Sequence, residues 1–369
     1  MSASADREVI RSGGGIGASS SGGLGRVGVI GLGLIGGSIA LGLSGNHDVS
    51  GYDSDPGVMS DANGRGIPTA SLDCIIRRSD LVVVCVPVDA IRRTFQSISE
   101  AVGLDSGRTP SQPPVVTDTC PVQRESAAAS AVLAGMGVPF VGGHPMAGKE
   151  VGGFRNAEAS IFRGSPWALL LDDDTSLDSY LRTMVLPLAL GARVVPARPE
   201  HHDRAVGLVS HLPHVIAAAL ARLAASSDVL GLPAALAGGS FRDMIRVAGG
   251  SPEMAATMCS FNSDMLSDAQ RRFAMDIEVA MSDSQYDMLL DYFMTATLSA
   301  ERLVRIRTGG PVPSRTQEAP GGSVTWPAGR LEPMRSWLTD LGLAGGHVTG
   351  IDGDGASGVT LSYWAPPGN

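Results

Sequence analysis

Residues 26–36 read RVGVIGLGLIG and decide the fold of the first half of the chain. The apolar run 26–30 predicts a buried strand, and a glycine-rich turn and a helix-like segment follow it directly. In such a turn the first glycine permits the bend, the second lets the backbone approach a pyrophosphate, and the third lets the helix pack on the strand. Amides at the start of the helix then bind the phosphates. The candidate cofactor loop is Gly31, Leu32, Gly33, Leu34, Ile35 and Gly36.

Asp53 ends the next predicted strand, 48–53, and lies 20 residues after Gly33. A carboxylate at this place bonds the ribose hydroxyls of NAD and repels a 2′-phosphate. Residues 54–56 are Ser, Asp and Pro, so no arginine follows at once to accept that phosphate. The segment therefore favours NAD over NADP. The alternatives are a glycine turn without a ligand and, for Asp53, an ordinary turn residue.

Short β-branched runs alternate with helix-length segments throughout residues 26–197. After 26–30, the predicted strands are 48–53, 81–86, 114–118, 138–142, 167–171 and 192–195. Segments long enough for crossover helices separate the early strands. We therefore expect an α/β Rossmann-like fold, with a doubly wound and mostly parallel sheet, over residues 26–197.

The sequence pattern changes from strand-like to helical after residue 197. Residues 198–308 contain almost no strand-like run, and the stretch 206–225 repeats apolar residues at helical spacing. We expect an all-helical domain whose long apolar faces bury against a second copy, giving a homodimer. Residues 1–25 are predicted to be a disordered tail, 309–322 a linker, and 323–369 a small βαββ extension. The extension is too short to stand alone, so it either docks on the body or forms half of a small regulatory ligand-binding domain.

Composition excludes several classes of protein. The net charge of −9, without long basic runs, argues against a nucleic-acid partner. The four cysteines are scattered without a CxxC pair, which is typical of reduced cytoplasmic thiols and not of a zinc site. No apolar run reaches about 18 residues and the first residues lack an apolar signal core, so neither a membrane span nor a membrane partner is expected. Lys149 is the one lysine among 28 basic residues, which makes any single arginine a weak functional signal.

The stretch 142–150, GGHPMAGKE, follows a predicted strand. Ligands gather at the carboxyl ends of strands in such sheets. His144 is bracketed by glycine and proline, so we expect it on a fixed turn. Histidine is the natural proton acceptor near neutral pH. The alternative is an ordinary loop histidine.

Two further polar segments lie in the helical half, 210–214 (SHLPH) and 238–246 (GGSFRDMIR). The paired histidines lack a nearby cysteine or acidic cluster, so we predict no metal site. Arg242 and Arg246 share a helix face, with Asp243 beside them. This arrangement suits one arginine held by a carboxylate while the other binds an anionic substrate, and the alternative is a surface ion pair.

In their order and spacing, GLGLIGGS, GGHPMAGKE, SHLPH and GSFRDMIRVA resemble the prephenate/arogenate dehydrogenase family of tyrosine biosynthesis, over about residues 26–308. Other dehydrogenases with the glycine motif, such as 2-hydroxyacid or 6-phosphogluconate-like enzymes, share the first segment alone. The resemblance implies a cytoplasmic, NAD-dependent dimer that oxidatively decarboxylates a cyclohexadienyl acid such as prephenate or arogenate. A ring-carbon hydride passes to the nicotinamide, the carboxylate leaves as CO₂, and the ring becomes aromatic.

The resemblance also implies roles for single residues. His144 is the base that takes the proton of the ring 4-hydroxyl, Arg246 binds a substrate carboxylate, and His211 is structural. Acidic residues organise this arginine and the mouth of the site. The remaining substrate-site candidates are His214, Glu150, Asp243 and Lys149.

One motif departs from the family. After the strand that ends at Asp118, itself a cofactor-site candidate, the family usually reads Asp-x-x-Ser-x-Lys, and here Pro121 and Gln123 replace the serine and the lysine. Proline has no side-chain donor or acceptor, so one substrate contact is lost. Either water or Thr119 replaces it, or the substrate carries a 4-amino group, as in 4-amino-4-deoxyprephenate. A non-catalytic NAD-binding homologue is the remaining alternative.

Overall fold

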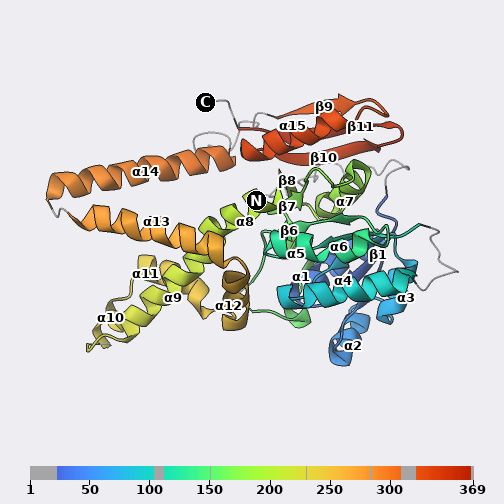
Figure 1. Ribbon diagram of the computed structural model, residues 1–369. Coiled ribbons are helices and arrows are strands. Elements are labelled where there is room, and N and C mark those ends of the chain that lie inside the picture. The colour runs from blue at the N-terminus through green and yellow to red at the C-terminus, as the bar shows by residue number, and fades with distance from the viewer. Residues whose placement is uncertain are drawn as a thin grey trace, which may run out of the picture.

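The computed structural model describes residues 23–103, 112–149, 151–229, 231–282, 285–308 and 321–366. Figure 1 shows the sheets with their covering helices, a long helical arm, and a C-terminal unit in which α15 lies beside β9, β10 and β11 of the second sheet. Most of the predicted tail 1–25 and linker 309–322 lies outside the described residues, as does Glu150.

The first sheet is parallel throughout, in the order β2-β1-β3-β4-β5. Its strands are β1 (Arg26–Ile30), β2 (Asp48–Tyr52), β3 (Leu81–Val84), β4 (Val115–Asp118) and β5 (Phe140–Val141). Its helices are α1 (Leu34–Leu43), α2 (Pro56–Gly64), α3 (Leu72–Arg78), α4 (Val88–Gly103), α5 (Gln123–Ala129) and α6 (Ala131–Ala134). The predicted Rossmann-like fold class is confirmed.

Two apolar layers, one on each face, bury this sheet. Val27 and Val29 pack with α1 and with α7 (Leu177–Ala189) on one face, whereas Ile30 packs with α3, α4 and α6 on the other. Side chains alternate across a strand, so a strand covered on both faces needs apolar residues at nearly every position. This requirement explains the continuous apolar runs that made the strands recognisable in the sequence.

The second sheet is mixed, in the order β6-β7-β8-β10-β11-β9. Its strands are β6 (Gly143–Pro145), β7 (Pro166–Leu170), β8 (Arg193–Ala197), β9 (Gly321–Trp326), β10 (His347–Asp354) and β11 (Gly358–Trp364). The short 3₁₀ turns η1 (Phe154–Asn156) and η2 (Ala159–Phe162) separate β6 from β7. Strands β7 and β8 are parallel, and the other neighbours are antiparallel.

The placement of His144 on a turn is wrong. It lies in β6, where it pairs with Ala168 of β7. Strand β6 has three residues, and its glycine and proline disfavour strands, so its sequence gave no strand signal. Pairing with β7 fixes the backbone of His144 more firmly than a free turn would.

The helical arm follows β8. It contains α8 (Pro199–Val206), a π turn at η3 (Gly207–His211), α9 (Leu212–Ala225), α10 (Gly231–Leu236), α11 (Gly239–Ile245), η4 (Arg246–Gly249), α12 (Pro252–Phe261), α13 (Ser263–Ser282) and α14 (Tyr286–Thr308). Among the described residues, the run Pro199–Ala225 is long and apolar enough to cross a membrane by length and composition alone. Counting uninterrupted apolar residues misses this run, because polar residues such as Ser210 and His214 interrupt it. One such helix is weak evidence for a membrane span.

The C-terminal unit continues the second sheet. β10 pairs with β8 through Val348 and Val194, and α15 (Glu332–Leu343) packs on β8. Met334 and Leu338 of α15 belong to the same buried cluster as residues of β7, β8 and α7. Arg335 adds hydrogen bonds from its guanidinium to the carbonyl oxygens of Asp172 and Thr175. The βαββ piece therefore docks on the body and shares its core.

The packing of α15 on β8 leaves no room for a side chain at Gly342. A Cβ there would lie 1.8 Å from the carbonyl oxygen of Pro196. We expect Gly342→Ala to lower the free energy of unfolding by about 1–3 kcal/mol, as overpacking does, measured by denaturant unfolding. Gly64→Ala is the matched control, because nothing lies within 4 Å of its Cβ position. Equal stabilities of the two variants would contradict this packing.

Candidate active site

His144 begins a line of three hydrogen-bonded side chains that joins the two parts of the molecule. Its Nδ1 lies 2.9 Å from Nε2 of His202 in α8, and the two rings meet edge to face with centroids 5.1 Å apart. Nδ1 of His202 lies 2.8 Å from Oδ1 of Asp203. Both His202 and Asp203 are buried. The Asp203 carboxylate thus contacts the His202 imidazole, which in turn contacts His144.

Asp203 is the anchor of this line. Its carboxylate accepts the backbone N–H groups of Gln123 and Arg124 at 2.8 and 2.9 Å, and Nε of Arg124 at 3.2 Å. Burial opposes ionisation of Asp203, but the hydrogen bonds from His202, Arg124 and Gln123 outweigh it and lower its pKa. Asp203 is therefore a buried carboxylate that can only accept hydrogen bonds.

The environment of His144 keeps its imidazole neutral. Burial, and then the neighbouring His202 and His211, hold the pKa of His144 well below its usual range, although Asp203 acts in the opposite direction. A histidine with a lowered pKa carries a free lone pair at neutral pH. His144 can therefore accept a proton there.

Asp118 holds the strand that carries His144. Its buried carboxylate accepts the backbone N–H of Gly143 at 2.8 Å and a hydrogen bond from Ser126 Oγ. Burial raises the pKa of Asp118 to about 6, although these hydrogen bonds act in the opposite direction. Its side chain is fully buried and supports β6 from within, and its contact with a cofactor stays a prediction.

Gln123, at the position of the family lysine, also holds the strand that carries His144. Its Nε2 donates to the carbonyl oxygens of Gly143 at 2.8 Å and Cys120 at 2.7 Å, and lies 3.4 Å from Oδ1 of Asp118. The side chain is buried. The neutral amide of Gln123 thus links β4 and β6 by hydrogen bonds. A lysine at this position would place a positive charge there instead.

Arg124 extends the network into the helical arm. Its Nη2 lies 2.6 Å from Asp264 Oδ1 and 3.3 Å from Asn262 Oδ1. Nδ2 of Asn262 in turn lies 3.1 Å from Nδ1 of His211, which is fully buried in the π turn. Burial lowers the pKa of His211 to about 4. His211 therefore belongs to the internal network at the junction.

The other predicted substrate residues lie on α9, α11, η4 and the segment after β6. His214, partly buried at the start of α9, has Nδ1 at 2.9 Å from the carbonyl oxygen of Ser210. Arg246 begins η4, which packs on α9, and it is exposed, as is Asp243 of α11. The ammonium group of Lys149 contacts Glu158 at 2.5 Å and the carbonyl oxygen of Asn156 at 3.1 Å. The structure thus places Lys149 in an ion pair, and no described contact joins it to His144.

The glycine loop has the geometry of a phosphate cradle. Gly31 has φ +91°, and a Cβ at Gly36 would lie 1.9 Å from the carbonyl oxygen of Gly31. Above Gly33, which precedes α1, a Cβ would meet nothing within 4 Å, so the loop is open to a ligand there. Asp53 accepts the N–H of Leu32 at 2.7 Å, which holds its carboxylate at the loop. Within the described residues, no group of three or more metal-ligating side chains is placed to hold an ion.

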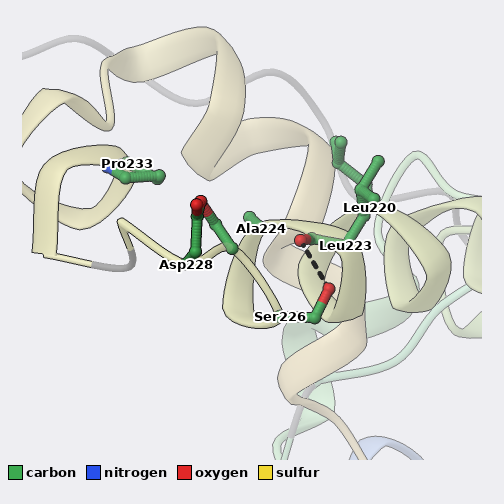
Figure 2. A pocket seen from close by; sticks show the side chains of 7 residues that line it. Leu220, Leu223, Ala224, Ser226, Asp228 and Pro233 are labelled. Atoms are coloured by element: carbon green, nitrogen blue, oxygen red, sulfur yellow. Dashed lines mark hydrogen bonds between the residues drawn. The ribbon is translucent and has the colours of Figure 1, made fainter.

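A hollow of about 620 Å³ lies far from these residues, in the helical arm. Figure 2 shows its lining, with Leu220 and Leu223 of α9 on one side and Pro233 of α10 on the other. In Figure 1 α9 runs outward from α8, and α10 lies at a tip of the arm away from β6. This hollow holds none of the predicted site residues.

Sequence reasoning missed His202, Asp203 and Arg124. The adjacent pair His202-Asp203 near the start of the helical half was a weak signal, because acidic residues are common near the start of any helix. Nothing in the local pattern shows that Asp203 would cap the amides of a helix that begins at Gln123. Such contacts between distant segments follow from the tertiary fold.

Two family models match the chain. The model described as prephenate dehydrogenase, nucleotide-binding domain, matches residues 39–195, and the one described as prephenate dehydrogenase, dimerization domain, matches residues 198–295. A Bacillus subtilis prephenate dehydrogenase is 27% identical over 294 residues, which cover 77% of this chain and 77% of the relative.

Solved structures agree. Synechocystis arogenate dehydrogenase is 27% identical with a TM-score of 0.64, and the match covers 75% of this chain and 99% of that one. Aquifex aeolicus prephenate dehydrogenase, solved with hydroxyphenyl propionate and NAD+, is 25% identical with a TM-score of 0.65, over 76% of this chain and 98% of that one. With both domains matched in order, the chain belongs to the prephenate dehydrogenase family.

Proposed function

We propose that this protein is a cytoplasmic, NAD-dependent dehydrogenase that oxidatively decarboxylates a prephenate-type cyclohexadienyl acid in aromatic amino acid biosynthesis. One observation carries the proposal. His144 lies on β6 as a neutral imidazole, and His202 of the helical arm holds it through a hydrogen bond. It therefore sits at the junction of a nucleotide-binding fold and the helical arm. Relatives that share both domains are prephenate, cyclohexadienyl and arogenate dehydrogenases.

The glycine loop and Asp53 fit NAD. The open face above Gly33 and the first turn of α1 suit the pyrophosphate, and the Asp53 carboxylate suits the ribose hydroxyls. NAD, when bound, supplies the nicotinamide that accepts a hydride. No arginine for a 2′-phosphate directly follows Asp53, because residues 54–56 are Ser, Asp and Pro.

The chemistry of the chain lies in proton transfer and charge. His144 takes the proton of the substrate 4-hydroxyl as the hydride leaves the same ring carbon, and a carbonyl forms there. Loss of CO₂ from the opposite ring carbon then returns the electrons to that oxygen, which recovers a proton from His144. Arg246 provides a cation for a substrate carboxylate, because its guanidinium matches the geometry of the carboxylate.

The protein is proposed to act as a homodimer through its helical arm. Large apolar side chains are exposed along α13 and α14. They are Phe273, Met275, Ile277, Val279, Met281, Tyr286, Met288, Leu290, Phe293, Met294, Leu298 and Leu303. Exposed apolar side chains in this number mark an interface, and a second copy of the same arm would cover them.

A panel of substrates tests the proposed activity. Purified protein with NAD is expected to form NADH with prephenate or arogenate, followed by absorbance. Because Pro121 replaces the family serine, 4-amino-4-deoxyprephenate belongs in the panel, and turnover of this compound alone would reassign the substrate. Absence of NADH with all three, while NAD still binds, would favour a non-catalytic NAD-binding protein.

His144→Asn removes the proposed base and keeps a similar size. We expect kcat to fall by about 10²–10⁴-fold, the usual contribution of a general base, while the Kd for NAD stays unchanged. Steady-state kinetics and calorimetric titration of NAD measure the two effects. Unchanged turnover would remove His144 from this role.

Arg246→Ala removes the proposed carboxylate contact. We expect KM for the cyclohexadienyl acid to rise roughly 10- to 100-fold, in keeping with a lost charged hydrogen bond. Arg242→Ala, one helical turn earlier and also exposed, is the control. Equal KM values for the two variants would make Arg246 a surface residue.

Phe293→Asp places a charge on the apolar face of α14, where Phe293 is 62% exposed. We expect the wild-type protein to sediment as a dimer and the variant to shift toward the monomer, because a charge is costly to bury. Leu343→Asp in α15, where Leu343 is 63% exposed outside the arm, is the control. A dimer that is insensitive to Phe293→Asp would place the interface elsewhere.

A further inference from the structure

We propose that His202 and Asp203 are positioning residues that keep the proton of neutral His144 on Nδ1 and leave its Nε2 as the proton acceptor. The inference rests on the proposed role of His144 as the base. A histidine can act as a base through one nitrogen only if the proton sits on the other. The contacts of the line fix where each proton lies.

The assignment begins at Asp203, whose carboxylate has no proton to donate. Its two oxygens already accept the N–H groups of Gln123 and Arg124, and Nε of Arg124. Nδ1 of His202, at 2.8 Å from Oδ1, must therefore be the donor in that contact. When His202 carries a single ring proton, that proton therefore sits on Nδ1, and Nε2 carries the lone pair.

The second contact follows from the first. Nε2 of His202 faces Nδ1 of His144 at 2.9 Å, and a lone pair there needs a donor opposite. His144 must donate from Nδ1, so its Nε2 has no proton. His202 is 4% exposed, so water has little access to compete for this contact. Both tautomers are therefore set by the one carboxylate.

The same line offers a place for the positive charge that forms during the reaction. When Nε2 of His144 takes the substrate proton, the cation is shared with His202 through the proton on Nδ1. If that proton moves to Nε2 of His202, the charge comes to lie beside Asp203, and His144 is neutral again. No proton is gained or lost along the line, and a buried cation is placed next to an anion.

Arg124 holds the anchor itself in place. It binds Asp203 through Nε and through its backbone N–H, and it binds Asp264 of α13 through its terminal nitrogens. The carboxylate that sets the tautomer is thus fixed jointly by α5 and, through Arg124, by the helical arm. Its position depends on how these two parts are assembled.

Nitrogen NMR of the full-length protein tests the tautomer directly. With ¹⁵N-labelled histidine, long-range proton–nitrogen spectra distinguish a protonated from an unprotonated ring nitrogen, and His144→Asn identifies the His144 signals by their loss. We expect Nδ1 of His144 to carry the proton in the wild-type protein near neutral pH. A proton on Nε2 would overturn the proposal, and this measurement needs neither a substrate nor a folded His202 variant.

Two substitutions at His202 then test the consequence for catalysis. His202→Phe keeps a ring but removes the acceptor, and we expect kcat to fall about 10²-fold with the KM for NAD unchanged. His202→Gln retains an acceptor and is expected to recover part of kcat. The control is His201→Phe, the same change at the neighbouring residue outside the line.

The outcomes separate this proposal from the proposed function. If the wild-type protein turns over none of the substrate panel, the proposed function fails, and the tautomer of His144 is still decided by NMR. If the wild type is active but His202→Phe keeps full kcat, or the NMR signals of His144 are unchanged in it, His202 does not position the base. Equal losses of kcat in His202→Phe and His201→Phe would also overturn the proposal.

Discussion

The arrangement of the site depends on the hydrogen bonds that the buried carboxylate of Asp203 accepts. Asp203 lies near the start of the helical half, yet it caps the first amides of α5 in the nucleotide-binding half. Through His202 it reaches β6, and through Arg124 it reaches α13. An unpaired charge at this depth would be costly, so its donors must all be in place for the two halves to join. The contacts of Asp203 that join the two halves therefore also support His144.

Sequence patterns predicted the first sheet well because its residues obey local rules. A strand covered on both faces is apolar throughout, and a glycine with φ +91° at Gly31 cannot readily be replaced. The same rules fail for β6, where pairing with β7 makes a strand from a glycine, a histidine and a proline. They fail again for Asp203, whose partners lie about eighty residues earlier in the chain.

Resemblance to the family located His144 but gave no account of what supports it. From the sequence, Pro121 removes one substrate contact, and Gln123 replaces the family lysine without an assigned role. In the structure Gln123 joins the carbonyl oxygens of Gly143 and Cys120 beneath the strand that carries His144. Burial raises the pKa of Asp118 to about 6 and the hydrogen bond from the Gln123 amide offsets only part of this rise, whereas a cation there would lower the pKa further. Replacement of the family lysine by Gln123 thus changes the charge of the side chain that holds the strand of His144.

The pairing of β10 with β8 has a consequence for truncated forms of this chain. β8 is an interior strand here, because the C-terminal strands take up the hydrogen-bonding edge that it would otherwise present. A shortened chain that ended after α14 would present that edge and the apolar surface under α15 to solvent. Bare strand edges pair with one another between molecules, so such a fragment is expected to aggregate. The C-terminal unit therefore also protects the sheet that carries His144 from self-association.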